Sequence, residues 1–259
     1  MKFKVAIIGY GVVGKAMHHL FPQALIDDKK KLSVKKATDK QINRADVAFV
    51  CVPTPSKPDG RCDISIVEAV VSRLKTPLII IRSTIEPGTT DYLKKKYQKR
   101  IVFCPEYLGE TTDHPLRNEK ARSFLILGGE RKDTNKAIEV FQQVFNASIK
   151  IRQMQAVEAE VAKYLENRHI AFKVAECNEA YDFCQKLGVD YNNIREAVFQ
   201  DDPRMSPYWT FVYPDNRGFA TKCIPKDVEA ISAQARDIGS PMKITEKILE
   251  VNKKWRRKK

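Results

Sequence analysis

The stretch that decides the fold is Val5-Ala6-Ile7-Ile8-Gly9-Tyr10-Gly11-Val12-Val13-Gly14. Its four apolar residues predict a buried strand, and the glycines after them have the G-x-G-x-x-G spacing of a turn into a helix. Such glycines permit a tight turn, a close approach of the backbone to a pyrophosphate, and close packing of helix on strand. The helix N-terminus then faces the phosphates. The residues expected to contact a dinucleotide here are Gly9, Gly11, Val12, Val13 and Gly14.

An acidic residue ends the next apolar run. Asp27 follows Ala24–Ile26, close to the spacing of about 20 residues at which a carboxylate binds the adenosine ribose. A carboxylate at this point disfavours a 2′-phosphate, so the sequence predicts NAD as the cofactor in preference to NADP. Asp28 is the alternative for this role.

Apolar runs alternate with helical patterns through the first half of the chain. Strands are predicted at Val5–Ile8, Ala24–Ile26, Val47–Val52, Leu78–Arg82, Ile101–Cys104 and Phe124–Leu127. Helices are predicted near residues 12–20, 65–75, 89–98 and 132–145. This alternation is typical of a parallel sheet with crossover helices. We therefore expect an α/β fold, with a Rossmann-type doubly wound parallel sheet in an NAD-binding domain of residues 1–152.

The second half has a different pattern. Residues 156–187 contain no Gly or Pro and place apolar side chains mostly at steps of three and four, which predicts one long helix. Gly188 is a suitable terminator. Shorter helices are predicted near residues 190–199, 226–238 and 241–255. An all-helical domain of residues 153–259 is expected, with the long helix at its centre.

Composition limits the class of protein. The hydrophobic fraction of 43% with 30% charged residues is that of an ordinary globular protein. No apolar run approaches the roughly 20 residues that span a bilayer, so no membrane association is expected. The six cysteines form no CxxC pair, which favours reduced thiols and a cytoplasmic location over disulfides, and no metal site is expected.

The net charge of +14 is partly gathered in lysine runs and in the tail Lys253–Lys259. Basic clusters of this kind bind nucleic acid in some proteins, but they are more often solvated loops and chain ends. We expect no nucleic-acid partner.

A reactive thiol is predicted in Gly218-Phe219-Ala220-Thr221-Lys222-Cys223-Ile224-Pro225-Lys226-Asp227. Pro225 and Asp227 are typical of the first turn of a helix. Cys223 would then precede the helix, where the dipole and Lys222 or Lys226 favour the thiolate. A cysteine is more often a small buried apolar residue, but this polar, lysine-flanked loop favours a nucleophile.

Lys163 and Asn167 lie four residues apart on the predicted long helix and therefore on one face. A cation and an amide so placed can converge on one developing oxyanion. The alternative is a solvated lysine near a polar neighbour, which is common on any helix.

Taken together, these residues resemble the UDP-glucose/GDP-mannose dehydrogenase family over nearly the whole chain. Besides the glycine turn and the cysteine loop, the segments that carry the resemblance are Ala45–Pro55, Arg82–Thr90, Pro105–Glu110, Glu158–Tyr164 with Asn167, Asn178-Glu179, and Asp202–Arg204. The family oxidises the C6 alcohol of a nucleotide sugar to a carboxylate with NAD. The resemblance implies the same four-electron chemistry here.

The resemblance also implies roles for single residues. Cys223 attacks the aldehyde formed by the first hydride transfer, and a second NAD oxidises the resulting thiohemiacetal to a thioester. Lys163 and Asn167 stabilise the negative oxygen, Glu110 assists hydrolysis, and Thr84 and Asp227 hold the water. Implied cofactor contacts are Pro53, Thr54 and Thr84. Implied substrate contacts are Glu106, Tyr107, Leu108, Lys163, Asn167, Arg204 and Gly218. Arg204 is implied to reach the substrate of a partner subunit, and the helix 156–187 to form the core of a homodimer.

The sequence departs from the family pattern near the thiol. Ala220-Thr221 replaces a Gly-Gly pair, and the chain ends about 35 residues after Cys223, which predicts a short form without the family's C-terminal nucleotide-sugar-binding domain. The expected substrate is therefore a sugar or a nucleotide sugar, with the sugar and its carrier left open.

Two other classes of function remain open. One is a two-electron dehydrogenase of the 3-hydroxyacid type, which also joins a Rossmann domain to a helical domain with a Lys-xxx-Asn pair. A single hydride transfer needs neither Cys223 nor Glu110, so these residues argue against it. The other is a non-catalytic NAD-binding protein with a basic tail.

Overall fold

The structure is a computed structural model of the chain and describes residues 3–29, 34–109, 118–221 and 223–256. These residues divide into two compact units. Unit 1 comprises Met1–Pro55 and Cys62–Lys163, and unit 2 comprises Ser56–Arg61 and Tyr164–Lys259. The predicted domain boundary between residues 152 and 153 stays a prediction, because spatial compactness does not test which segments fold on their own.

Unit 1 is built on a sheet that has seven strands among the described residues, in the order β2-β1-β3-β4-β5-β6-β7. The strands are β1 (Val5–Ile8), β2 (Leu25–Asp27), β3 (Val47–Val50), β4 (Leu78–Ile81), β5 (Ile101–Phe103), β6 (Phe124–Gly128) and β7 (Lys150–Met154). β1 to β5 are mutually parallel. β6 runs antiparallel to β5 and parallel to β7. The predicted α/β doubly wound fold is confirmed, with this one reversal of direction.

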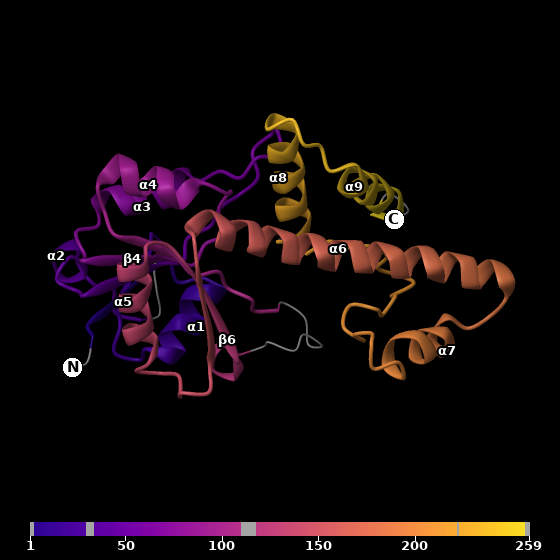
Figure 1. Cartoon of the computed structure of the whole chain (residues 1–259), viewed down its shortest axis with the longest axis horizontal. Helices are drawn as coiled ribbons and strands as arrows, with labels where there is room; N and C mark the ends of the chain where they lie inside the picture. The colour runs from indigo at the N-terminus through magenta and orange to yellow at the C-terminus, as the bar shows by residue number, and fades with distance from the viewer. Residues whose placement is uncertain (1–2, 30–33, 110–117, 222, 257–259) are drawn as a thin grey trace. The chain divides into compact units, whose positions relative to one another are not determined.

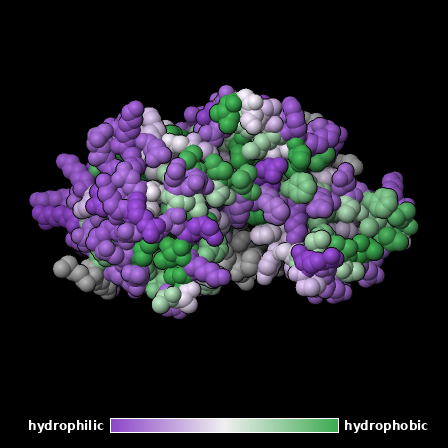
Figure 2. Space-filling view, in the orientation of Figure 1, coloured by the Kyte–Doolittle hydropathy of each residue, from purple (hydrophilic) through white to green (hydrophobic). Residues whose placement is uncertain are grey.

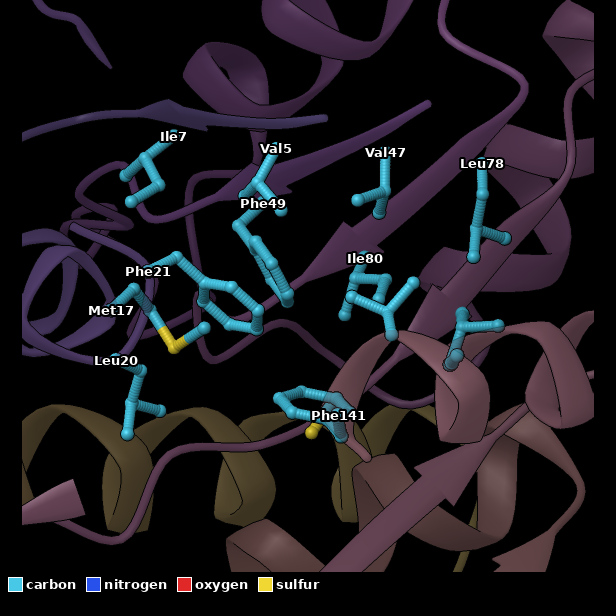
Figure 3. Packing of buried hydrophobic residues seen from close by; sticks show 14 of the residues in the cluster. Val5, Ile7, Met17, Leu20, Phe21, Val47, Phe49, Leu78, Ile80 and Phe141 are labelled. Carbon is cyan, nitrogen blue, oxygen red and sulfur yellow. The ribbon is translucent and has the colours of Figure 1, made fainter. Parts of the chain in front are cut away.

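Helices cover both faces of the sheet (Figure 1). On one face α1 (Val12–Leu20) and α5 (Arg131–Phe141) pack against strand side chains. Figure 3 shows this core, with Met17 and Leu20 of α1 and Phe141 of α5 around Phe49 and Ile80.

The other face is covered mainly by α3 (Ser65–Arg73) and α4 (Thr89–Tyr97). Two short elements complete unit 1: α2 (Asp39–Ile42) and the 3₁₀ turn η1 (Glu119–Ala121). Because successive side chains of a strand point to opposite faces, each central strand supplies both cores.

The long helix α6 (Ala156–Leu187) has the predicted bounds. Gly188 follows it with φ +71°, a left-handed conformation that glycine adopts without strain. Up to Lys163 the helix belongs to unit 1, and from Tyr164 onward it belongs to unit 2.

The rest of unit 2 is helical. Its elements are α7 (Tyr191–Arg195), the π-helical turn η2 (Glu196–Gln200), α8 (Ile224–Asp237) and α9 (Lys243–Arg256). Ala171 and Ala175 of α6 form a small core with Val228 of α8 and Ile248 of α9. The helix predicted near 190–199 therefore exists as two short pieces. Within the described part of the chain, no helix is long and apolar enough to cross a membrane.

Candidate functional site

The carboxyl ends of the parallel strands carry the predicted cofactor and substrate residues of unit 1. The glycine turn follows β1, Asp27 ends β2, and Pro53-Thr54 comes after β3. Thr84 follows β4 and the Glu106–Leu108 segment follows β5. Parallel strands have their carboxyl ends at one edge, and ligands of doubly wound sheets bind there. The topology thus brings these segments to a common edge.

The three motif glycines differ in what a side chain would meet. A Cβ at Gly9, where φ is +92°, would lie 2.5 Å from the carbonyl oxygen of Cys51. A Cβ at Gly14 would lie 1.9 Å from the carbonyl oxygen of Gly9. At Gly11 it would meet nothing within 4 Å. Two glycines therefore serve packing, and the third leaves the backbone open to a ligand.

The N-terminus of α1 is suited to phosphate. Gly11 is its N-cap, no side chain caps it, and its first turn holds no acidic residue. Val12 is 69% exposed and Val13 is half-buried. Backbone N–H groups and the positive end of the helix dipole at such a terminus bind phosphate groups. The predicted role of these residues toward a dinucleotide fits this geometry.

The two candidate ribose carboxylates have different partners. Asp27 is buried and forms ion pairs with Arg73 and with Lys36, the latter at 3.2 Å. Asp28 accepts a hydrogen bond from the backbone N–H of Tyr10 at 2.6 Å. The Asp28 side chain thus fixes the glycine turn, whereas cations hold Asp27 in place at the end of β2. The choice of Asp27 as the ribose ligand stays a prediction.

Thr54 and Thr84 are brought together. The Thr54 hydroxyl donates to the carbonyl oxygen of Thr84 at 2.8 Å. The thiol of Cys62 contacts the same carbonyl oxygen at 3.7 Å. This carbonyl thereby ties the end of β3 to the segment after β4. Pro53 is exposed beside it.

The segment after β5 carries the predicted substrate contacts. Glu106 is half-buried and accepts a hydrogen bond from the backbone N–H of Leu108 at 2.8 Å. The ring of Tyr107 is buried, and Nζ of Lys163 lies 4.7 Å from its centroid. Lys163 itself is 4% exposed. Glu110, the predicted hydrolytic base, lies outside the described residues.

A buried ion network behind Tyr107 was not predicted from the sequence. Arg82 and Arg122 both pair with the Glu119 carboxylate, and all three side chains are almost fully buried. Burial alone would raise the pKa of Glu119, but the two guanidinium groups outweigh it and hold that pKa below its usual value. Arg82 also donates to the Cys104 sulfur at 3.0 Å. The available sequence signal was the charged Arg82 directly after the apolar strand Leu78–Ile81.

A second unpredicted carboxylate lies on α6. Glu160 is fully buried and accepts hydrogen bonds from the backbone N–H of Gly88 at 2.6 Å and of Thr90 at 2.8 Å. The Thr90 hydroxyl also donates to it at 2.6 Å. Burial raises the pKa of Glu160 to about 7. Glu160 anchors the start of α6 to the start of α4, three residues ahead of Lys163.

In unit 2, Cys223 is the N-cap of α8 and Pro225 lies in the first turn, as predicted. Of the six cysteines, all within the described residues, Cys223 alone is half-buried and the others are buried. Cys51 illustrates the contrast, because burial raises the pKa of its thiol to about 12. Access and a helix N-terminus favour Cys223 as the nucleophile. Lys222 lies outside the described residues.

Asn167 and Asp227 are in direct contact. The Asn167 Nδ2 group donates to the Asp227 carboxylate at 2.5 Å, and both side chains are buried. Lys226 forms an ion pair with the same carboxylate, so Asp227 offsets much of the charge that Lys226 would present to the thiol. The backbone N–H of Asp227 donates to the carbonyl oxygen of Cys223 at 3.0 Å. Asp227, the partner of Asn167, thus lies one helical turn after Cys223 on α8.

Two asparagines that the sequence did not single out for this purpose hold the loop ahead of Cys223. Asn252 accepts from the backbone N–H of Phe219 at 2.8 Å and donates to its carbonyl oxygen at 3.0 Å. Asn178 accepts from the backbone N–H of Gly218 at 3.1 Å and from Arg217 at 2.6 Å. The loop backbone is thereby fixed from α6 and α9.

Arg204 is exposed, with 83% of its side chain accessible, and it forms an ion pair with Asp202 at 2.6 Å. Its predicted reach to a partner subunit stays a prediction.

The glycine turn, the uncapped N-terminus of α1 and the doubly wound sheet define a dinucleotide-binding protein of the Rossmann type. Residues 22–149 match the family model for the NAD binding domain of the UDP-glucose/GDP-mannose dehydrogenase family, and residues 157–254 match that for its central domain. The chain belongs to the UDP-glucose/GDP-mannose dehydrogenase family, and the dinucleotide of its N-terminal unit is NAD.

Relatives show the same likeness over part of their length. A UDP-glucose 6-dehydrogenase of Rickettsia bellii is 26% identical over 244 residues, which are 90% of this chain and 54% of the relative. The UDP-glucose 6-dehydrogenase TuaD of Bacillus subtilis is 26% identical over 230 residues, 83% of this chain and 48% of the relative. The chain thus spans about half the length of these relatives.

Solved structures share the fold. A UDP-glucose dehydrogenase from Pyrobaculum islandicum has a TM-score of 0.85 at 23% identity, covering 99% of this chain and 69% of that one. A 3-hydroxyisobutyrate dehydrogenase from Mycobacterium tuberculosis has a TM-score of 0.71 at 18% identity, covering 100% of this chain and 95% of that one.

Proposed function

We propose that this chain catalyses the NAD-dependent four-electron oxidation of a primary alcohol of a sugar or nucleotide sugar to the carboxylate. The balanced reaction is RCH2OH + 2 NAD⁺ + H2O → RCOO⁻ + 2 NADH + 3 H⁺. The observation that carries the proposal is the placement of Cys223 at the N-terminus of α8, one turn from the buried contact between Asn167 and Asp227. Membership of the family and its NAD binding domain support it.

NAD, when bound, accepts one hydride in each of the two oxidations. Between them, the Cys223 thiolate adds to the carbonyl carbon of the aldehyde, so a C–S bond forms and the carbonyl oxygen gains negative charge. After the second oxidation the product is a thioester. Water then attacks the thioester carbon, the C–S bond breaks, and the thiolate leaves with the acid released.

The negative oxygen needs fixed donors. Asn167 Nδ2 carries two hydrogens, and Asp227 accepts one of them, which orients the amide before substrate arrives. Lys163 lies one helical turn earlier on α6 and supplies a positive charge. Donors held in place in this way stabilise an oxyanion without reorganisation during the reaction.

The remaining roles complete the proposed site. Glu110 serves as the base for thioester hydrolysis, and Thr84 and Asp227 hold the attacking water. The proposed substrate contacts are Glu106, Tyr107, Leu108, Arg204 and Gly218.

The covalent step has a direct test. Cys223→Ser is expected to abolish acid formation, whereas Cys184→Ser, at a buried thiol of unit 2, is the matched control and should retain it. A thermal-shift screen of nucleotide sugars and free sugars with NAD present identifies the substrate, because a ligand stabilises the folded chain according to its concentration over its Kd. Acid release by Cys223→Ser at the wild-type rate would contradict the proposal.

Stoichiometry separates the proposal from the two-electron alternative. Two NADH per product support acid formation through the thioester, and one NADH supports a dehydrogenase of the 3-hydroxyacid type. Binding of NAD with no turnover on any member of the screen would favour the non-catalytic alternative. Salt-sensitive nucleic-acid binding that is lost on deleting residues 253–259 would point to the basic tail.

We also propose that the partner of α6 is a second copy of this chain. Leu165, Phe172 and Phe183 are exposed, and at 100° per residue they fall within about 20° of one line along the helix. Figure 2 shows apolar surface in the region of α6 and α7, and Phe183, Leu187 and Ile194 of these two helices are exposed. Sedimentation of wild-type chain and of Phe183→Glu tests this, with a monomeric wild type as the contradicting result. The six free cysteines support a reducing, cytoplasmic setting.

A further inference from the structure

The ring of Tyr107 contacts two cations and a second aromatic ring in unit 1. The Lys163 ammonium lies 4.7 Å from the ring centroid, and the Arg122 guanidinium carbon lies 4.9 Å from it. The ring of Phe124 packs edge-on against Tyr107, with centroids 5.1 Å apart. One aromatic ring from the segment after β5 therefore contacts two buried cations.

Lys163 is 4% exposed, so its ammonium has lost most of its hydration. The face of an aromatic ring attracts a cation electrostatically, and the attraction is strongest where water is excluded. The Tyr107 ring thus replaces part of the solvation that Lys163 has lost.

The ring of Tyr107 also contacts Arg122, whose own position is fixed by several interactions. Arg122 contacts both Tyr107 and Phe124, and it is fixed by an ion pair with Glu119 at 2.9 Å and by a hydrogen bond to the carbonyl oxygen of Pro105 at 3.0 Å. Glu119 also pairs with Arg82, so its carboxylate links the two guanidinium groups and fixes the orientation of Arg122. The network of Glu119 and Arg122 therefore gives Tyr107 a rigid support.

We propose that Tyr107 is a positioning residue, whose ring holds the Lys163 ammonium in place for stabilising the oxyanion. This rests on the proposed dehydrogenase function of Lys163 and adds to it a residue that acts through Lys163. A side chain that contacted only substrate would govern KM, whereas a support for Lys163 governs kcat.

The first experiment needs no substrate. Wild-type chain, Tyr107→Phe and Tyr107→Leu are labelled with trace acetic anhydride at fixed pH, and the rate at Lys163 is read by mass spectrometry against the exposed Lys96. The ring covers the Lys163 amine and holds it in place, so loss of the ring is expected to raise the Lys163 rate by about 2-fold to 30-fold, the range of a cation–π contact. Tyr107→Phe keeps the ring and should label like wild type. Equal rates in all three chains would overturn the proposal.

The second experiment uses turnover. Tyr107→Leu is expected to lower kcat by a similar factor, beyond any change in KM from its proposed contact with substrate, and Tyr107→Phe to restore kcat. Phe124→Leu is the matched control for lost packing, because it truncates a ring of the same cluster that packs on Tyr107 and Arg122. If Tyr107→Leu does not fold, phenylalanines of increasing fluorination at position 107 weaken the ring face at nearly constant shape, and labelling should rise with fluorination. Absence of turnover in wild type would refute the dehydrogenase function alone, since the labelling result stands without it.

Discussion

Glu160 should make the free energy of unfolding depend on pH. This carboxyl group is fully buried and receives three hydrogen bonds at the start of α4. Burial raises its pKa from 4.5 to about 7, despite the hydrogen bonds from Thr90 and Gly88, which lower it. Glutamine at this position has no titration, so a comparison of the two chains isolates this one group.

The direction of this pH dependence is set by how many protons the folded and unfolded chains bind. A folded-state pKa above the unfolded value means that the folded chain binds more protons between pH 4.5 and 7, so the free energy of unfolding falls as the pH rises through this window. The difference between the two pKa values corresponds to about 3 kcal/mol. In the Glu160→Gln variant, the amide N–H group faces a backbone N–H donor. At pH 5 this variant should therefore be less stable than wild type by about 1–3 kcal/mol.

The gap between the two chains should therefore close, or reverse, between pH 5 and pH 8. Urea unfolding followed by circular dichroism at several pH values measures it. Hydrogen exchange at the Thr90 amide, which donates to Glu160, gives a local reading in unit 1. A difference in unfolding free energy that stayed constant from pH 5 to pH 8 would refute the reasoning, because it would mean that Glu160 has the same pKa in the folded and unfolded chains.

Other changes test the cofactor and thiol regions. Gly11→Ala should alter the unfolding free energy by less than about 0.5 kcal/mol yet weaken NAD binding about 10-fold or more in calorimetry, because its Cβ meets no protein atom. Gly14→Ala should instead destabilise the fold by more than about 2 kcal/mol in urea unfolding, since its Cβ would overlap a backbone oxygen; equal behaviour of the two variants would contradict this distinction. Glu119→Gln should cost about 3–5 kcal/mol in the same assay, because it leaves buried guanidinium charge unpaired, and a loss under 1 kcal/mol would be against it. Asp227→Asn should lower kcat about 10-fold or more, because a charged partner of Asn167 is lost, and wild-type turnover would disprove that role.

Most of the fold could be predicted because its signals are local. The turn from Gly9 to Gly14 and the helix Ala156–Leu187 follow from spacing within one short stretch. β7 was missed because Lys150–Met154 lies at the sheet edge with exposed charged positions and no apolar run. The change from the α-helix α7 to the π-helical turn η2 was missed, because the apolar residues of 191–200 satisfy a helical pattern in either type of helix.

In the candidate site, too, the features with a local sequence signal could be predicted and those that depend on remote partners could not. Cys223 at a helix N-terminus could be found because Pro225 and Asp227 mark that terminus within four residues. The supports of the site could not, because their partners are remote in sequence. Asn252 and Phe219 are 33 residues apart, and Glu160 and Thr90 are 70 apart. Pairings of that kind depend on the tertiary fold, and a single sequence contains no local pattern for them.

The departure of Ala220-Thr221 from the family's glycine pair changes the surroundings of the thiol, not the backbone that carries it. Among the described residues, Gln98 and Trp209 are the non-glycine positions with positive φ, so neither Ala220 nor Thr221 is in a conformation that requires glycine. The glycine that is needed is kept: Gly218 has φ +72°, and a Cβ there would lie 2.3 Å from Asn252. The Thr221 hydroxyl oxygen accepts a hydrogen bond from the backbone N–H of Ile224, the first residue of α8, at 3.3 Å. Since Ala220-Thr221 adds side-chain atoms where a Gly-Gly pair has only hydrogen, the difference bears, under the proposed function, on the size and shape of the substrate and not on the proposed chemistry of Cys223.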